Sequence, residues 1–311
     1  MRLSCVVPAT NDPPTLVLCL RAIEEADDPP DELICVRDPA DAGPAAARNL
    51  GTERADGEVV AFVDADVVVH PDAFTRLRAA FAADPGLSAV FGSYDDEPSE
   101  PDPVSGYRNL LHHLTHVEGA GEAHTFWAGL GAVRRDDLLG AGGFDAERYP
   151  HPSVEDIELG GRLSAAGLRL RLDPDIRGTH LKRWTLREMV RVDLTRRGIP
   201  WTRLVLETGG GGDALNLGLR HRLSALSALG AALALALRRP RGAAAWVLVL
   251  VALNRRLLAL VWLRRGARQS LIAVPLHLIH SLTAVAAAVA GSVAHAAEGL
   301  RSDGADPGPP R

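Results

Sequence analysis

The chain has 311 residues and a formal net charge of −5, enough length for one large domain or two modest ones. The mild acidity argues against nucleic acid as the main partner, because nucleic-acid binding usually needs a basic face. Cys5, Cys19 and Cys35 are spaced like neither a zinc site nor a redox pair, so we expect small buried residues in a reducing compartment.

The N-terminal part alternates between strand-like and helix-like segments. Apolar runs at 3–7, 32–36 and 59–63 predict buried strands, and 16–23 and 44–55 carry helical patterns. This alternation with short links is typical of a doubly wound α/β sheet, in which ligands bind beyond the carboxyl ends of the strands. The first run is too short for the apolar core of a signal peptide, so we expect the first half to stay in the cytosol.

Acidic and amide side chains follow each of these three predicted strands. Asp64 and Asp66 come directly after the third, while Asn11 and Asp38 follow the first and second. Two carboxylates at a strand end suit a hard divalent cation, which takes oxygen ligands and can hold a diphosphate at the same time. An acidic turn between strand and helix is the plain structural alternative for Asp64 and Asp66.

The middle of the chain predicts further strands and helices around a second acidic pair. We expect helices at 72–83 and 107–117, strands at 87–91, 130–133, 168–172 and 176–180, and a solvated loop at 95–103. The three histidines within 107–117 are expected to be surface or hydrogen-bonded residues, since no carboxylate or cysteine completes a zinc site.

The second acidic pair opens a predicted helix. Ser153 can cap that helix, with Glu155 and Asp156 in its first turn, where acids stabilise the positive end of the helix dipole. Asp156 has an alternative role, because its side chain can instead face the site. Downstream, the cluster 180–184 leads into a basic, aromatic-bearing helix at 184–208, which is typical of a membrane surface or of a solvated face.

Composition changes after a glycine-rich linker at 209–222. We expect a membrane-associated helical region at 223–297 with about three segments, of which 271–293 is long enough to span a bilayer alone. The arginines of 255–268 would each cost about 2.5–3.5 kcal/mol at the centre of a span, so we interpret that segment as an interfacial helix. The tail, 298–311, is polar and rich in Pro and Gly, which predicts disorder.

Seven short motifs in order resemble a family 2 glycosyltransferase of the GT-A type with a membrane-attached C-terminus: VVPATN, CVRD, GPAAARNLG, VDAD, GAVRRDDLLGAGGFD, VEDIELGGRL and HLKRW. The resemblance covers roughly residues 3–201. Arg37 stands where the family usually has an acid, and His180 stands where processive members carry the glutamine of Q-x-x-R-W. The resemblance implies a GT-A nucleotide-sugar-binding fold, a mostly parallel sheet flanked by helices, filling 1–208 and followed by C-terminal membrane helices.

The resemblance also implies an activity. It indicates an inverting, metal-dependent hexosyltransferase that moves a sugar from a nucleotide diphosphate sugar to a hydroxyl of a lipid-linked, membrane-proximal or saccharide acceptor. Asp156 would be the catalytic base, and Asp66 and His180 would bind Mg²⁺ or Mn²⁺, although His180 could instead contact the acceptor. We expect a multi-pass protein of the cell membrane with a cytoplasmic catalytic domain and no nucleic-acid partner.

Two further sets of residues carry expected roles. The donor nucleotide would be bound by Pro8, Asn11, Asp38, Arg48, Asp64 and Arg183. The acceptor would be contacted by Trp127, Glu155 and Trp184. Two structural alternatives remain open: Arg48 would only hold the nucleotide loop in shape, and the two tryptophans would only pack in the interior.

Three other functions are compatible with parts of the sequence. A phosphohydrolase of the haloacid dehalogenase type would use Asp64 as its nucleophile, but it needs a downstream lysine, and Lys182, the sole lysine, lies in an Arg/Trp cluster. A nucleotidyltransferase would use a similar sheet and release pyrophosphate. A catalytically silent membrane scaffold would retain a degenerate transferase domain, for which Arg37 gives some support.

Overall fold

The computed structural model describes residues 1–209 and 218–303, which divide into two compact units. The first unit comprises residues 1–184 and 256–273. The second comprises the remaining described residues, 185–209, 218–255 and 274–303. Residues 210–217, in the predicted linker, and 304–311, in the predicted tail, lie outside the described residues.

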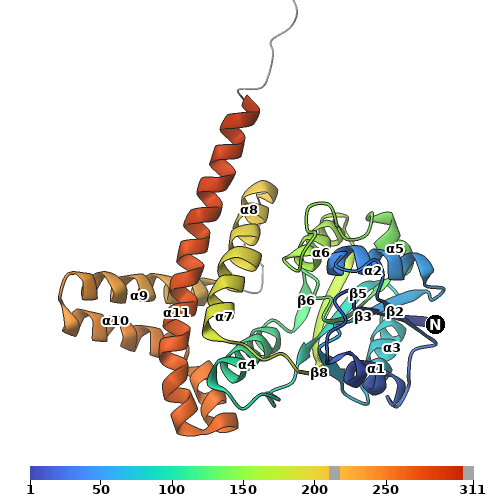
Figure 1. Cartoon of the computed structure of the whole chain (residues 1–311), viewed down its shortest axis with the longest axis horizontal. Helices are drawn as coiled ribbons and strands as arrows, with labels where there is room; N and C mark the ends of the chain where they lie inside the picture. Colours follow the sequence, from blue (N-terminus) through green and yellow to red (C-terminus); the bar gives the residue numbers. More distant parts are fainter. Residues whose placement is uncertain (210–217, 304–311) are drawn as a thin grey trace, which may run out of the picture. The chain divides into compact units, whose positions relative to one another are not determined.

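The first unit is built on a sheet that has eight strands within the described residues (Figure 1). Its order is β2-β1-β3-β7-β5-β8-β4, with β6 paired to β8. The strands are β1 (Leu3–Pro8), β2 (Glu32–Val36), β3 (Val59–Val63), β4 (Val67–Val69), β5 (Leu87–Tyr94), β6 (Gly121–Ala123), β7 (Leu130–Arg134) and β8 (Arg169–His180).

The sheet is mixed, which corrects the expectation of a mostly parallel sheet. The pairs β1–β2, β1–β3 and β5–β8 are parallel. Strand β7 runs antiparallel between β3 and β5, and β4 and β6 both pair antiparallel with β8. The parallel order of β2, β1 and β3 matches the predicted doubly wound half, so only the part after β3 departs from it.

Helices cover both faces of the sheet, and successive side chains of β3 alternate between the two faces. Val59, Ala61 and Val63 face a core shared with α1 (Leu16–Glu24) and α3 (Ala73–Ala83), while Val60 and Phe62 face α2, α5 and α6. Both faces of β3 are therefore dry, which explains why its sequence is a continuous apolar run. The remaining helices of this unit are α2 (Gly43–Arg54), α4 (Pro103–Glu118), α5 (Arg135–Gly140) and α6 (Glu155–Ala165).

Strand β8 replaces the two short strands predicted at 168–172 and 176–180. Its pairing with β5 is irregular, because Phe91 pairs with Leu172 but Ser93 pairs with Arg177. Pro174 lies within this bulge, where the ladder does not need the backbone N–H that proline lacks. The β5 residue at the bulge is Gly92, and a Cβ there would overlap the backbone oxygen of Ile176.

The second unit is helical. The predicted basic helix at 184–208 consists of α7 (Leu186–Val192), a π-helical turn η1 (Asp193–Gly198) and α8 (Ile199–Thr208), and Thr185 begins it with a capping box to Glu188. Further along are α9 (Leu219–Ala236), α10 (Pro240–Leu253) and α11 (Arg255–Asp303). Helix α11 is two helices that meet at Gly266, whose φ of 82° is non-helical, and its first part belongs to the first unit.

Among the described residues, one helical stretch, Arg255–Glu298 of α11, is long and apolar enough to cross a membrane, judged by length and composition. The expected set of about three spans is therefore not supported. Helix α10 has 14 residues and is only about 21 Å long, shorter than the roughly 30 Å of a bilayer core. Helix α9 begins with the basic run Arg220–Arg222. The residues 298–303, expected in the disordered tail, continue α11.

Candidate functional site

A buried arginine links two acidic segments that are far apart in the sequence. Arg48, on α2, donates from Nη2 to Oδ1 of Asp64 at 2.8 Å and from Nη1 to Oε1 of Glu155 at 2.9 Å. Arg48 is 3% exposed and Glu155 is 4% exposed. Burial lowers the pKa of Arg48, but the charges of Asp64, Glu155 and Asp156 outweigh it, so the pKa lies above its ordinary value and the guanidinium stays charged.

These contacts bear on two predicted roles. Arg48 was expected to bind the donor and Glu155 to touch the acceptor, but each side chain is buried and holds the other. The roles predicted for Arg48 and Glu155 stay predictions, and the observed contacts link the two side chains to each other and Arg48 to Asp64. Ser153 does not cap α6: the N-cap is Val154, and the backbone N–H of Ser153 donates to Oε2 of Glu155 at 2.8 Å.

Asp156 follows Glu155 and is held by backbone groups. The N–H of Ala128 donates to its Oδ2 at 3.1 Å, and its own neighbour Ile157 donates to Oδ1 at 2.8 Å. Burial, together with the negative charge of Glu155, raises the pKa of Asp156 to about 7. A carboxyl group with this pKa can both accept and release a proton near neutral pH.

The start of β7 brings Asp64 and Asp156 to the same edge of the sheet. The backbone N–H of Asp64 donates to the carbonyl of Gly129 at 3.0 Å, immediately before the β3–β7 ladder begins at Val63 and Leu130. Ala128, whose N–H reaches Asp156, is the preceding residue. The predicted meeting of the two acidic motifs is thus observed, through the loop that opens β7.

Asp66 is paired with the end of β8. Its Oδ2 lies 3.6 Å from Nε2 of His180, and its backbone oxygen accepts from the N–H of Leu181 at 2.8 Å. The His180 ring stacks on Tyr94 with centroids 4.1 Å apart and planes 9° apart. Burial raises the pKa of Asp66, but the hydrogen bond and charge of His180, with the charge of Lys182, leave it below its ordinary value.

Asp66 and His180 offer donor atoms of the kind that a divalent metal ion takes. An oxygen and a nitrogen donor 3.6 Å apart suit one divalent ion, with the remaining positions open to a diphosphate and water. Within residues 1–209 and 218–303, no group of three or more His, Cys, Asp or Glu side chains forms a complete site. The pair therefore fits an ion that is shared with a bound anionic ligand.

The other predicted donor residues lie at the neighbouring strand ends. Pro8 ends β1, Asn11 is exposed in the turn that follows, and Asp38 is exposed two residues after β2. Since β2, β1 and β3 are parallel neighbours, these residues share an edge with Asp64. Arg37 is exposed there too, 3.9 Å from Asp12.

Among the described residues, no contact connects Arg183 or Trp184 to that edge of the sheet. Arg183 is exposed, and its charge contributes to the lowered pKa of Asp102, at the start of α4. Trp184 is 4% exposed, with Lys182 over its ring at 4.5 Å and Arg108 at 5.3 Å. Trp184 is therefore a buried packing residue, in agreement with its structural alternative, and does not offer an open face for an acceptor sugar.

Trp127 belongs to an aromatic cluster with Tyr94, His112 and His116. Its ring centroid lies 4.8 Å from those of Tyr94 and His112 and 5.2 Å from that of His116. His116 also places Nδ1 2.9 Å from Gly92 O, and burial lowers its pKa to about 4, so the ring is neutral. The expectation of hydrogen-bonded histidines is confirmed for His116 and for His113, whose Nδ1 lies 2.8 Å from Tyr94 O.

Comparison with known proteins finds similarity over part of the chain. Residues 36–139 match the profile of the family described as Glycosyl transferase family 2. Residues 36–139 are thus similar to a family 2 glycosyltransferase domain. Pre-mycofactocin glycosyltransferases from two strains of Mycobacterium tuberculosis, CDC 1551 / Oshkosh and ATCC 25618 / H37Rv, are each 31% identical over 160 residues. That alignment covers 49% of this chain and 33% of each relative, so the chain spans about a third of their length.

The fold agrees with this family. A mannosyltransferase from Pyrobaculum calidifontis, solved in complex with GDP-Man and Mn²⁺, is 18% identical, with a TM-score of 0.53 over 91% of this chain and 87% of that chain. At this identity the likeness shows the fold alone. The mixed sheet with flanking helices is the GT-A fold that the motifs of the family 2 domain predicted.

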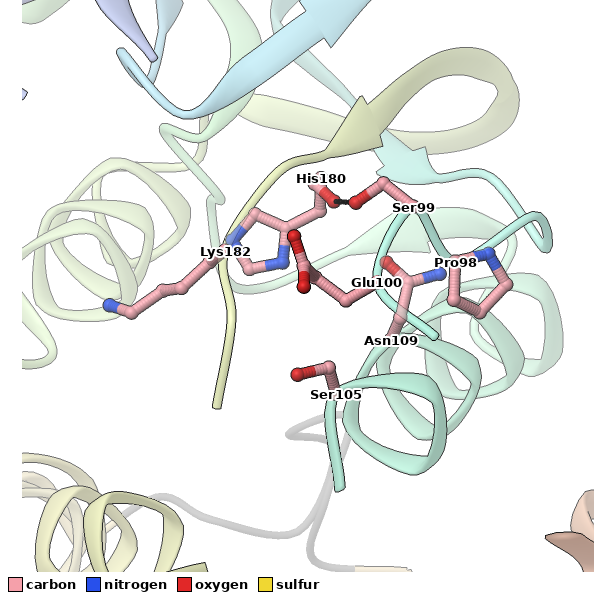
Figure 2. A pocket seen from close by; sticks show the side chains of 7 residues that line it. All are labelled: Pro98, Ser99, Glu100, Ser105, Asn109, His180 and Lys182. Carbon is pink, nitrogen blue, oxygen red and sulfur yellow. Dashed lines mark hydrogen bonds between the residues drawn. The ribbon is translucent and has the colours of Figure 1, made fainter. Parts of the chain in front are cut away.

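The structure also brings together residues near Asp66 that sequence reasoning missed. A small pocket beside His180 is lined by Pro98, Ser99, Glu100, Ser105, Asn109, His180 and Lys182 (Figure 2). The charge of Lys182 lowers the pKa of Asp66, whereas the motif pattern favours Arg183 as the cation near the diphosphate. The sequence offered one signal for Lys182, which is the only lysine of the chain.

Proposed function

We propose that the protein is an inverting glycosyltransferase that moves a sugar from a nucleotide diphosphate sugar to a hydroxyl group. The observation that carries the proposal is the contact of Arg48 with both Asp64 and Glu155, which ties the residue preceding Asp156 to the first aspartate of the D-x-D motif. A family 2 domain on a GT-A fold supports the reaction class.

Asp156 is the general base in this proposal. Its carboxylate accepts the proton of the acceptor hydroxyl while that oxygen attacks the anomeric carbon, and the bond to the diphosphate breaks on the opposite face, which inverts the configuration. The pKa of about 7 leaves a large ionised fraction at neutral pH while keeping the group basic enough to accept a proton. A positioned base of this kind contributes typically about 10²–10⁴-fold to the rate.

The diphosphate of the donor is assigned to the edge formed by Asp66 and His180. These two side chains would hold Mg²⁺ or Mn²⁺, which when bound supplies charge neutralisation for the leaving diphosphate. Asp64 is held by Arg48 through Oδ1 and would contact the nucleotide. Pro8, Asn11 and Asp38 would line the base and ribose at the ends of β1 and β2.

The acceptor is assigned to a lipid-linked or membrane-proximal class. The support is the helix Arg255–Glu298, which has the length and composition of a membrane span, in the same chain as the family 2 domain. An enzyme anchored in this way is confined to the surface where lipid-linked hydroxyl compounds lie. We place the catalytic domain on the cytoplasmic side, where nucleotide sugars are made.

A screen of nucleotide sugars with Mn²⁺ tests the proposal. The full chain is assayed for release of a nucleoside diphosphate, with Asp66→Ala and Asp156→Asn as the variants and Asp136→Asn, an exposed acid on α5, as the control. We expect turnover by the wild type and the control, weakened donor binding in Asp66→Ala, and donor binding without turnover in Asp156→Asn. An active Asp156→Asn enzyme would contradict the assignment of the base.

The same assay separates the other functions. A haloacid dehalogenase type of phosphohydrolase needs Asp64 free to attack phosphorus, whereas here its oxygen is 2.8 Å from Arg48. Phosphorylation of Asp64 by a phosphate ester would support that function instead. Release of pyrophosphate would indicate a nucleotidyltransferase, and absence of donor binding with any metal would indicate a catalytically silent scaffold.

A further inference from the structure

The loop between β5 and α4, residues 95–102, is attached to the first part of α11. Arg264 pairs with Asp96, its Nε donating to Oδ2 at 2.8 Å. Beyond the break at Gly266, Gln269 donates from Nε2 to the carbonyl of Pro101 at 3.3 Å. Both contacts lie within the first unit, which includes residues 256–273. The predicted interfacial helix is thus part of the unit that contains the candidate site.

Arg265 makes the central contact with this loop. Its Nη1 donates to Pro98 O at 3.3 Å and its Nη2 donates to Glu100 O at 2.8 Å, so it holds the two carbonyls on either side of Ser99. Gly106 of α4 leaves room for the guanidinium, because a Cβ there would lie 3.3 Å from Nε of Arg265. A planar guanidinium can reach two acceptors at once, which an ammonium does poorly.

Ser99 carries the contact onward to the candidate ion site. Its hydroxyl donates to the backbone oxygen of His180 at 2.6 Å, which Figure 2 shows as a dashed line. The imidazole of the same residue stacks on Tyr94 and lies 3.6 Å from Asp66. A continuous path of contacts therefore runs from Arg265, through Ser99, to His180.

We propose that Arg265 is a positioning residue for the ion-binding pair Asp66 and His180. By fixing the carbonyls on either side of Ser99, it sets the backbone of His180 and hence the direction of the imidazole toward Asp66. Residues that orient a metal ligand without touching the metal commonly control its affinity. This inference rests on the proposed function, since it assigns a role at the same site.

The test measures Mn²⁺ binding to the full chain in detergent. Free Mn²⁺ is followed by electron paramagnetic resonance in the presence of GDP, UDP, ADP, CDP or dTDP. We expect Arg265→Ala to bind Mn²⁺ about tenfold more weakly, as outer partners of metal ligands typically do when removed. Arg265→Lys should recover only part of that loss. Arg268→Ala, which removes an exposed arginine of the same segment, should bind as the wild type does.

A double-mutant cycle separates positioning from loss of stability. Ser99→Ala should weaken Mn²⁺ binding by a similar factor, and Arg265→Ala/Ser99→Ala should be no weaker than either single variant, because both act along one path. A lower unfolding midpoint for Arg265→Ala with unchanged Mn²⁺ affinity would overturn this inference and leave the proposed function intact. Absence of Mn²⁺ binding to the wild type with every nucleotide would overturn the metal-dependent function and this inference with it.

Discussion

The backbone N–H of Ala128 donates to the Asp156 carboxylate at 3.1 Å, so the proposed base is oriented by the loop that opens β7. That loop also receives the N–H of Asp64 at Gly129. The backbone of Asp64 and the side chain of Asp156 are therefore both held by adjacent residues of one short segment. Any change that moves residues 128–129 should disturb both halves of the proposed reaction.

The pH dependence of turnover should report Asp156. Its pKa is raised to about 7, and the base acts only when ionised, so kcat/KM should fall about tenfold per pH unit below 7 and level off above it. The measurement is a pH–rate profile with the donor that the screen identifies. Asp156→Glu, which keeps a carboxyl group at a shifted position, should retain an acidic limb at reduced rate. A flat profile between pH 5 and pH 8 would contradict this role.

The same shift predicts a pH-dependent gain in stability on neutralising Asp156. The ordinary pKa of an aspartate carboxyl is 3.8, and burial raises it to about 7 in the folded chain, so the folded state holds the proton more tightly than the unfolded state does. Stability is therefore lost as pH rises from about 4 to about 7. Asp156→Asn should raise the unfolding midpoint at pH 8 and leave it nearly unchanged at pH 4. An equal shift at both pH values would rule out the ionisation as the cause.

Removal of Arg48 should be costly because it leaves Glu155 buried without its cation. We expect Arg48→Ala to lower the free energy of unfolding by about 3–5 kcal/mol, as for other broken buried ion pairs. Denaturant titration of the purified chain provides the measurement. The double variant Arg48→Met/Glu155→Leu should lose less, since no unpaired charge remains. A larger loss in the double variant would contradict this explanation.

Two adjacent glycines of α6 give a matched test of its packing. A Cβ on Gly160 would overlap the backbone nitrogen of Phe126, whereas nothing lies within 4 Å of a Cβ on Gly161. Gly160→Ala should destabilise the fold by about 1–3 kcal/mol, and Gly161→Ala should stabilise it by up to about 1 kcal/mol. Thermal and denaturant unfolding of both variants would check this, and equal behaviour would contradict it.

The elements around the D-x-D motif were predictable because local patterns decide them. The strand predicted at 59–63 is β3, Val59–Val63, since a strand buried on both faces must be apolar throughout. The direction of β7 was not predictable, because the residues of a strand carry no mark of the direction in which it pairs. That direction is what places Gly129 beside Asp64.

The acidic residues of the candidate site could be predicted from the sequence, but the side chains that contact them could not. Asp64, Asp66 and Asp156 stand out because carboxylates at strand and helix ends are costly without a function. The partner of Glu155 is Arg48, 107 residues earlier, and the partners of Arg265 are more than 160 residues earlier. Hydrogen bonds of a guanidinium to backbone carbonyls leave no signature in residue type, so the Arg265 contacts needed the structure.

Because the backbone is non-helical at Gly266, the rotation of one half of α11 about its axis does not fix the rotation of the other half. In an uninterrupted helix, deleting one residue rotates everything beyond it by about 100°. Here the backbone leaves the helix directly after Arg265, so a change of length in the apolar stretch beyond Gly266 need not turn that arginine away from its loop. If that hydrophobic part crosses a bilayer, as we propose, its length can change to suit a thicker or thinner bilayer while Arg265 keeps its orientation.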